Sequence, residues 1–146
     1  MTGSSYRVPC EPVAPGTKVP SEAMCIIEAM PVKSLITAPR SGQRIAAGEA
    51  LSLSGHAWSG AGAIAEVALS TDFGASWQTA RLGAAENRFG WQRFEHTLTL
   101  PGPGYYEIWA RATDESGAIQ PMLLPGWNPK GYLNNASHRI AVKVLA

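Results

Sequence analysis

The residues best suited to chemistry lie in a loop near the end of the chain, within the stretch PGWNPKGYLNNASHRIAVKV at residues 125–144. Glycines, prolines and asparagines surround one loop cation, Lys130, just before a strand-like run. An ammonium group is a compact point charge that attracts anions. From the residues alone we interpret Lys130 as a solvated loop cation, and anion binding is the alternative.

Three histidines, His56, His96 and His138, are the other candidates for metal or acid–base chemistry. Each lies in a different predicted strand, and no ligand spacing connects them. His96 and His138 fall on faces that we predict to be apolar. We therefore predict no metal site. The residues also show no Ser/His/Asp set, Cys/His set or glycine-rich phosphate loop, so they indicate no catalytic residues and no free-standing enzyme.

The segment STDFGASW, residues 70–77, matches the pattern S-x-D-x-G-x-[ST]-W, the Asp box of sialidase propellers. We predict that Asp72 accepts hydrogen bonds from backbone amides of the turn, that Gly74 takes a positive φ and that Trp77 packs back onto the hairpin. A propeller would repeat this unit several times in a longer chain, whereas it occurs here once. The Asp box therefore predicts a turn and no propeller.

The overall composition indicates one globular domain. The chain has 146 residues, of which 45% are hydrophobic and 16% charged, and its formal net charge is +1. A domain of this length buries a sizeable core, and nearly balanced charges argue against nucleic-acid binding. No apolar run approaches the roughly 18 residues of a membrane span, and no signal peptide opens the chain. We predict neither nucleic-acid nor membrane partners.

Residues 1–31 are rich in proline and differ in character from the rest of the chain. Proline removes a ladder donor and biases its predecessor toward extended conformations. We therefore predict an extended arm with a short helical turn near SEAMCIIEAM. Cys10 and Cys25 both lie in this arm, without the CxxC spacing of metal and redox motifs. A disulfide between them is one alternative, and two unpaired thiols are the one that we favour.

From residue 32 onward, apolar and polar residues alternate as they do in half-buried strands. Turn signals such as PRSG, TDFG and DESG separate the alternating segments. The pattern is typical of an all-β fold, an antiparallel β-sandwich of immunoglobulin-like type. Tyr105 and Trp109 share one strand face, either as surface aromatics or as part of a partner surface. The predicted strands are residues 32–37, 49–58, 63–70, 76–82, 91–100, 104–113 and 138–145.

Three separated blocks resemble a known domain: VKSLITAPRSGQRI, LSGHAWSGAGAIAEVALSTDFGASWQTARL and GWNPKGYLNNASHRIAV. They are similar to the C-terminal dimerisation domain of the sulfite oxidase family of molybdenum (molybdopterin) oxidoreductases. The bacterial sulfite dehydrogenases and the molybdenum subunit of sulfane dehydrogenase are the nearest members. The resemblance assigns residues 32–146 to that domain. The stretch SYRVPCEPVAPGTKV resembles the tail of the preceding catalytic domain, so residues 1–31 would be a tail and linker.

The resemblance implies that this chain is one part of an oxidoreductase. In the family, the molybdopterin cofactor and the cysteine that ligates molybdenum belong to an upstream catalytic domain. Cys10 and Cys25 do not match that cysteine, so we expect no cofactor in this chain and no turnover by it alone. The resemblance also implies oxidation of a sulfur compound in the whole enzyme, a homodimer formed through the sandwich, electron transfer to cytochrome c and a periplasmic location.

The resemblance also gives the loop a role. In the family the cation, an arginine in sulfite oxidases, reaches the anion-binding pocket of the catalytic domain, which makes Lys130 a substrate-binding residue. Arginine grips an oxyanion through two parallel hydrogen bonds and lysine does not, so the identity of the sulfur substrate stays open. Many members carry Trp in place of Ser137. The family pattern W-N-x-[RK]-G-x-x-x-N is matched by Trp127, Asn128, Lys130, Gly131 and Asn135. The resemblance implies that the four residues other than Lys130 support the loop, and Gly131 would allow a close backbone approach.

The alternative function is a carbohydrate-binding or adhesion-type sandwich. Its Asp box and exposed aromatic side chains would grip sugar. It predicts a row of aromatics on one face and saturable glycan binding. The proline-rich arm favours the oxidoreductase interpretation, because it resembles a linker.

Overall fold

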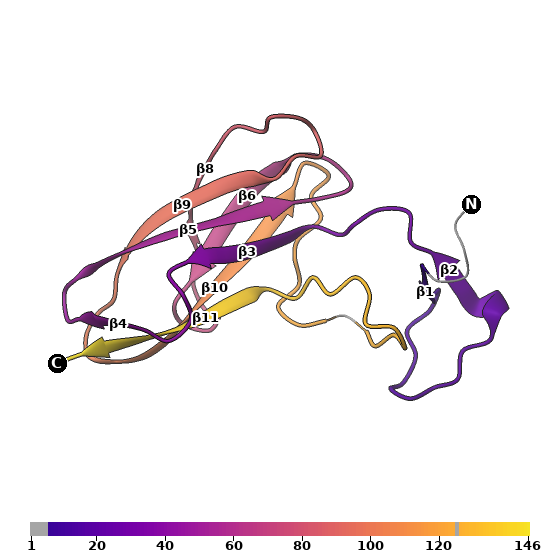
Figure 1. Cartoon of the computed structure of the whole chain (residues 1–146), viewed down its shortest axis with the longest axis horizontal. Helices are drawn as coiled ribbons and strands as arrows, with labels where there is room; N and C mark the ends of the chain where they lie inside the picture. Colours follow the sequence, from indigo (N-terminus) through magenta and orange to yellow (C-terminus); the bar gives the residue numbers. More distant parts are fainter. Residues whose placement is uncertain (1–5, 125) are drawn as a thin grey trace.

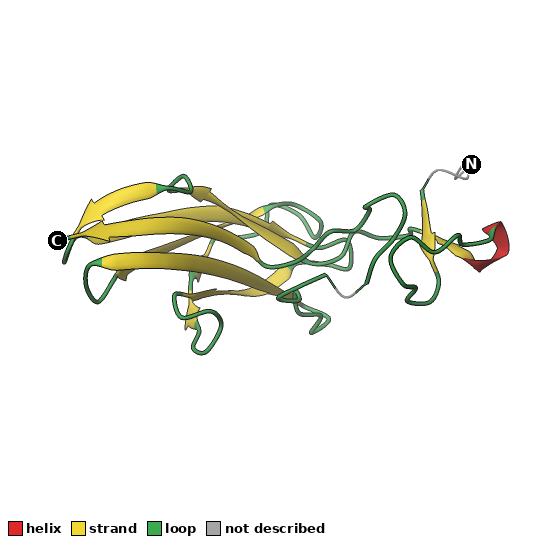
Figure 2. Cartoon of the chain, turned by 90° about the horizontal axis from the view of Figure 1, so that it is seen from below, coloured by secondary structure: helices red, strands yellow, loops and turns green. Residues whose placement is uncertain are grey.

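Two facing β-sheets form the body of the molecule (Figures 1 and 2). The computed structural model describes residues 6–124 and 126–146; Pro125 and the first five residues of the predicted arm lie outside the described residues. One sheet contains β4 (Gln43–Ala46), β6 (Ile64–Ser70), β7 (Gln78–Thr79), β10 (Gly104–Asp114) and β11 (His138–Leu145). The other contains β3 (Lys33–Ala38), β5 (Ala50–Trp58), β8 (Arg81–Leu82) and β9 (Gln92–Thr99).

The order of the strands is β4-β11-β10-β6-β7 in the five-stranded sheet and β3-β5-β9-β8 in the four-stranded sheet. The described strand pairs are antiparallel except for β11 with β4, which is parallel. The predicted immunoglobulin-like sandwich is confirmed. Two local predictions need correction. No strand was assigned to residues 43–46, and the single strand at 76–82 is in fact divided into β7 on one sheet and β8 on the other.

The core between the sheets contains most of the inward residues that the alternation predicts, and also Ile45 of the unpredicted strand β4. Phe94 of β9 and Ile108 of β10 are both 0% exposed. A Cβ at Gly55 of β5 would overlap the ring of Phe94 and the carbonyl oxygen of Leu35, so glycine is required there. Fully burying a side chain as large as that of Phe94 or Ile108 stabilises a fold by about 1.5–3 kcal/mol. The core therefore supplies the main force that holds the two sheets together.

The arm folds back on itself, contrary to the predicted extended form. Strand β1 (Arg7–Pro9) pairs antiparallel with β2 (Met24–Ile26), and the 3-10 helix η1 (Ser21–Ala23) lies at the predicted helical turn. Cys10 and Cys25 form a disulfide, so the preference for unpaired thiols was wrong. Pairing of the two short strands places the Cα atoms of Cys10 and Cys25 5.0 Å apart, within the usual range for a disulfide. No helix among the described residues is long and apolar enough to cross a membrane.

Candidate functional site

The loop that carries Lys130 connects β10 to β11 and is shaped by an asparagine. Oδ1 of Asn128 accepts hydrogen bonds from the backbone N–H groups of Lys130, at 3.2 Å, and Tyr132, at 3.0 Å. Nδ2 of Asn128 donates to the carbonyl oxygen of Tyr132 at 2.8 Å. These three bonds fix the turn in which the exposed Lys130 stands. The supporting role predicted for Asn128 thus has a direct geometric basis.

Gly131 is required by the turn itself. Its φ is 67°, in the left-handed region that glycine adopts at little cost. No described atom lies within 4 Å of the place where its Cβ would stand. Within this chain the reason for glycine is therefore conformational, and the close backbone approach stays a prediction.

The second half of the loop is attached to the sandwich. Asn135 is 8% exposed, and its Nδ2 donates to the carbonyl oxygen of Val32 at 3.2 Å. Both the backbone N–H and the hydroxyl of Ser137, which is also buried, donate to the carbonyl oxygen of Pro121. Asn135 therefore anchors the loop to the sandwich, whereas Asn128 and Gly131 shape the turn that carries Lys130.

A buried glutamine that the sequence analysis missed holds the base of the same loop. Gln120 is 0% exposed, and its Oε1 accepts bonds from the hydroxyl of Ser34 and the N–H of Ala112. Its Nε2 donates to the carbonyl oxygen of Ala136 at 3.0 Å. One side chain thus connects β3, β10 and the loop. Glutamine carries no sequence signal for such a role, because the partners come from three separate segments.

His138 opens β11 and connects it to the other sheet. Its Nδ1 accepts a hydrogen bond from the backbone N–H of Ile36 at 3.0 Å, which requires the neutral ring. Burial, together with the charge of Lys33, lowers the pKa of His138 below its ordinary value of 6.5. His138 thus opens β11 as a half-buried residue outside the core, with its Nδ1 hydrogen-bonded.

The arm contacts the loop on the side away from the sandwich (Figure 1). Val13 of the arm forms an isolated antiparallel bridge with Trp127. The ring of Tyr6 stacks on that of Tyr132, with 5.8 Å between centroids and 23° between planes. Trp127 thus supports the junction between arm and loop. This junction could not be found from the sequence, because its two halves come from opposite ends of the chain.

A cavity of about 400 Å³ lies where the arm and the loop meet. Among the described residues that line it are two cationic side chains and no carboxylate. Arg7, which the sequence analysis missed, comes from β1, and Lys130 comes from the loop. The lining residues are Arg7, Val19, Ser21, Met24, Pro129 and Lys130.

The Asp box forms the predicted turn between β6 and β7. Asp72 accepts bonds from the hydroxyl and the N–H of Ser76 and from the hydroxyl of Ser70, and these bonds lower its pKa from 3.8 to about 2. Gly74 has a φ of 86°. Nε1 of Trp77 donates to the carbonyl oxygen of Gly74 at 3.1 Å. All four interactions are internal to the turn, so the box has a structural role here.

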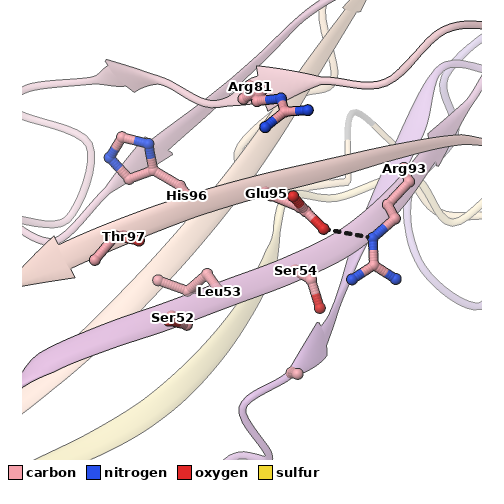
Figure 3. Close-up of a pocket in the computed structure, with 9 residues that line it drawn as sticks. Ser52, Leu53, Ser54, Arg81, Arg93, Glu95, His96 and Thr97 are labelled. Atoms are coloured by element: carbon pink, nitrogen blue, oxygen red, sulfur yellow. Dashed lines mark hydrogen bonds and ion pairs between the residues drawn. The ribbon is translucent and has the colours of Figure 1, made fainter.

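A wider hollow of about 560 Å³ lies on the outer face of the four-stranded sheet (Figure 3). Outward side chains of β5 and β9 line it, and Arg81 of β8 borders it. Arg93 and Glu95 form an ion pair of 2.8 Å with both side chains about half exposed. Such pairs are worth about 1 kcal/mol at most. The hollow is open and its Glu95 is already paired with Arg93, so we do not regard it as the functional site.

Two tryptophans, Trp58 and Trp91, stack on each other near the surface, whereas Trp109 is buried. Trp91 is 63% exposed and stacks on Trp58, with 5.0 Å between centroids. Trp109 is only 6% exposed: its Nε1 donates to Glu107, and Phe73 meets its ring edge-on. The expectation of a surface aromatic at Trp109 is therefore wrong, whereas its neighbour on the same strand face, Tyr105, is exposed.

The three histidines lie apart, as their spacing indicates. His56 is near the ring of Trp91, His96 is within 3.3 Å of Gln78, and His138 contacts Ile36. In the described ranges, no cluster of three or more His, Cys, Asp or Glu side chains could hold a metal ion.

Comparison with known proteins places these features in a family. Residues 24–145 match the family model of the Mo-co oxidoreductase dimerisation domain. Human mitochondrial sulfite oxidase is 38% identical over 125 residues, which cover 81% of this chain and 23% of that protein. The NADPH nitrate reductase of Phytophthora infestans is 32% identical over 102 residues, which cover 64% of this chain and 11% of that protein. The chain thus spans about a quarter or less of these relatives.

Solved structures agree with the sequence comparison. The sulfane dehydrogenase SoxCD from Paracoccus pantotrophus has a TM-score of 0.72 and 30% identity, covering 97% of this chain and 36% of that one. The CARDB domain of PF1109 from Pyrococcus furiosus has a TM-score of 0.51 and 15% identity, covering 82% of this chain and 97% of that one. The second likeness concerns the fold alone.

Proposed function

Because the chain belongs to the family of Mo-co oxidoreductase dimerisation domains, we propose that it serves an enzyme that oxidises sulfite or a related sulfur compound. The observation that carries this proposal is the family match over residues 24–145, supported by 38% identity to human sulfite oxidase. The chain covers 23% of that relative. The redox chemistry is therefore assigned to a part of the enzyme beyond these residues.

The residues of this chain do not fit the molybdenum–molybdopterin cofactor. Both cysteines are joined in a disulfide, so neither offers a thiolate to molybdenum. The described residues also contain no cluster of metal-binding side chains. We assign the cofactor to an upstream catalytic domain and assign no step of its chemistry to this chain.

The sandwich would pair with a second copy of itself. The family's description as a dimerisation domain supports a homodimer, and a two-fold interface requires a patch that is complementary to itself. Exposed aromatic side chains, including Trp91 and Tyr105, offer apolar surface for it. Sedimentation equilibrium of the chain tests this directly. A monomer at every concentration up to the millimolar range would contradict dimerisation through this domain.

Two further properties rest on the resemblance to bacterial members of the family. The whole enzyme would pass its electrons to cytochrome c and would act in the periplasm. Reduction of cytochrome c in the presence of sulfite, and fractionation of cells that express the whole protein, test these two points separately.

Lys130 would attract the substrate anion. Its exposure, the turn fixed by Asn128 and the absence of carboxylates from the adjoining cavity support this role. In the whole enzyme, Lys130→Ala should raise the KM for sulfite about tenfold, the effect of losing one charged hydrogen bond. Lys130→Arg is the matched control and should keep a low KM. An unchanged KM in the alanine variant would refute the role.

The carbohydrate-binding alternative retains one favourable observation. Trp58 and Trp91 stack beside the exposed Phe89, which gives a small aromatic surface at one end of the four-stranded sheet. Titration of the chain with a panel of oligosaccharides, followed by tryptophan fluorescence, tests it. Saturable binding that Trp91→Ala abolishes would favour this second function.

A further inference from the structure

We propose that Arg7 is a second cation of the candidate site, and that Arg7 and Lys130 together bind a divalent oxyanion, such as sulfate or sulfite, at the junction of arm and loop. This inference rests on the proposed role of Lys130 and adds a binding residue from the opposite end of the chain. Three observations carry it: an unpartnered donor, the composition of the cavity wall and the means by which both sides are fixed.

The first observation is the guanidinium of Arg7. Its Nε is buried and donates to no acceptor among the described residues. Buried polar groups are nearly always hydrogen-bonded, and a charged one is the most costly to leave without a partner. It is also the one side-chain N or O atom in the described ranges with this property. Arg7 therefore has a hydrogen-bonding capacity that the described residues leave unused.

The second observation is the wall of the cavity. In about 400 Å³ it combines the side chains of Arg7, Lys130 and Ser21, and none of the described residues that line it is a carboxylate. Arginine presents a planar fork to two oxygens of one anion, and lysine adds a point charge. Two positive charges match a divalent anion, and the three side chains can all donate hydrogen bonds. The two cations therefore favour an anionic ligand over a cationic one.

The third observation is that each cation stands on a fixed support. Arg7 pairs with Ile26 in the β1–β2 ribbon, which the disulfide between Cys10 and Cys25 closes. Lys130 stands in the turn that Asn128 holds. The Val13–Trp127 bridge and the Tyr6–Tyr132 stack then join the two supports. A site assembled before the ligand arrives loses less entropy on binding.

The test is sulfate binding to the chain, measured by isothermal titration calorimetry and by NMR of the arginine Nε–Hε groups. Arg7→Gln should weaken sulfate binding about tenfold or more, Arg7→Lys should restore part of the loss, and the Arg7 resonance should shift on titration. Arg44→Gln is the matched control, because it removes the same charge from the exposed face of β4. Far-UV circular dichroism establishes that each variant is folded.

Three results would overturn the proposal. Arg7→Gln could bind sulfate as tightly as the unaltered chain. Arg44→Gln could weaken binding as much as Arg7→Gln, which would reduce the effect to net charge. Sodium chloride at matched ionic strength could shift the same resonances as sulfate does, which would mean simple screening.

An assay of the whole enzyme separates this inference from the proposed function. If the enzyme oxidises sulfite and Arg7→Gln changes neither its KM nor inhibition by sulfate, the inference fails and the function stands. If the enzyme does not oxidise sulfite but sulfate binding to the chain depends on Arg7, the function fails and the anion site stands.

Discussion

The sandwich and the junction of arm and loop are held together by different means. Between the sheets, Phe94, Ile108 and Val142 belong to one continuous apolar core and are each at most 1% exposed. In the arm, none of residues 6–31 is buried, and the contacts are a disulfide, an isolated bridge and a ring stack. Stability thus comes from one region, and the candidate site lies in the other, where structure opens at lower cost.

The largest expected effect is in the core of the sandwich. Phe94→Ala should lower the free energy of unfolding by about 3–5 kcal/mol, because it removes a fully buried ring and leaves a cavity. The measurement is chemical denaturation followed by tryptophan fluorescence. Phe89→Ala, at a position 59% exposed, is the control and should change stability by less than about 0.5 kcal/mol. Similar losses in both variants would show that the core does not dominate stability.

The second effect separates the two regions. Closing the loop between Cys10 and Cys25, which are 15 residues apart, stabilises the folded arm by about 3 kcal/mol in the chain-entropy model. Replacing both cysteines by serine should open the arm and speed cleavage by trypsin after the exposed Lys18, with the melting temperature of the sandwich nearly unchanged. Limited proteolysis and calorimetry measure the two responses. A large drop in the melting temperature would mean that arm and sandwich unfold as one unit.

The third effect concerns His138, at the base of the loop. Since its folded-state pKa lies below 6.5, the unfolded chain takes up the proton first as the pH falls. The contribution of the neutral His138 ring to the free energy of unfolding is complete above pH 6.5. It decreases as the pH falls below 6.5, until the ring is protonated in the folded chain as well. His138→Gln keeps an acceptor for the N–H of Ile36 and should flatten this part of the stability–pH curve. An unchanged stability–pH curve in the His138→Gln variant would exclude His138 as the cause.

The smallest effect is in the Asp-box turn. Asp72 has a pKa of about 2 in the folded chain and 3.8 as its ordinary value, so its contribution is present above pH 3.8 and is lost as the pH falls toward 2. Asp72→Asn should remove that dependence. Thermal melts between pH 4 and pH 2 give the comparison, and identical curves for both proteins would contradict the assignment.

The sequence predicted what depends on local pattern. Alternation identified the strand that contains Phe94, and the Asp-box pattern identified the turn at Asp72. Prediction from the sequence failed where a residue's structure depends on a contact with a residue that is distant in the chain. The division of residues 76–82 between two sheets depends on how the sandwich closes, and the disulfide depends on the arm folding back. Trp109 is buried in part by Phe73, which lies in the connection between β6 and β7.

The candidate site shows the same limit. Lys130 was found because a family pattern surrounds it, and Asn128 because it belongs to that pattern. Arg7 and Gln120 carry no such signal, since an arginine in a proline-rich arm or a glutamine after a turn reads as an ordinary surface residue. Only the folded chain shows that one lines the cavity and that the other is fully buried.

The bridge between Val13 and Trp127 couples the position of the arm to that of the loop. If an anion is held between one residue on the arm and one on the loop, then binding it and fixing the angle of the arm are a single coupled equilibrium. Linkage requires the coupling to be reciprocal: whatever restrains the arm tightens anion binding, and the anion restrains the arm by the same factor. When the anion binds, any domain attached to the arm would therefore lose part of its freedom to rotate relative to the sandwich.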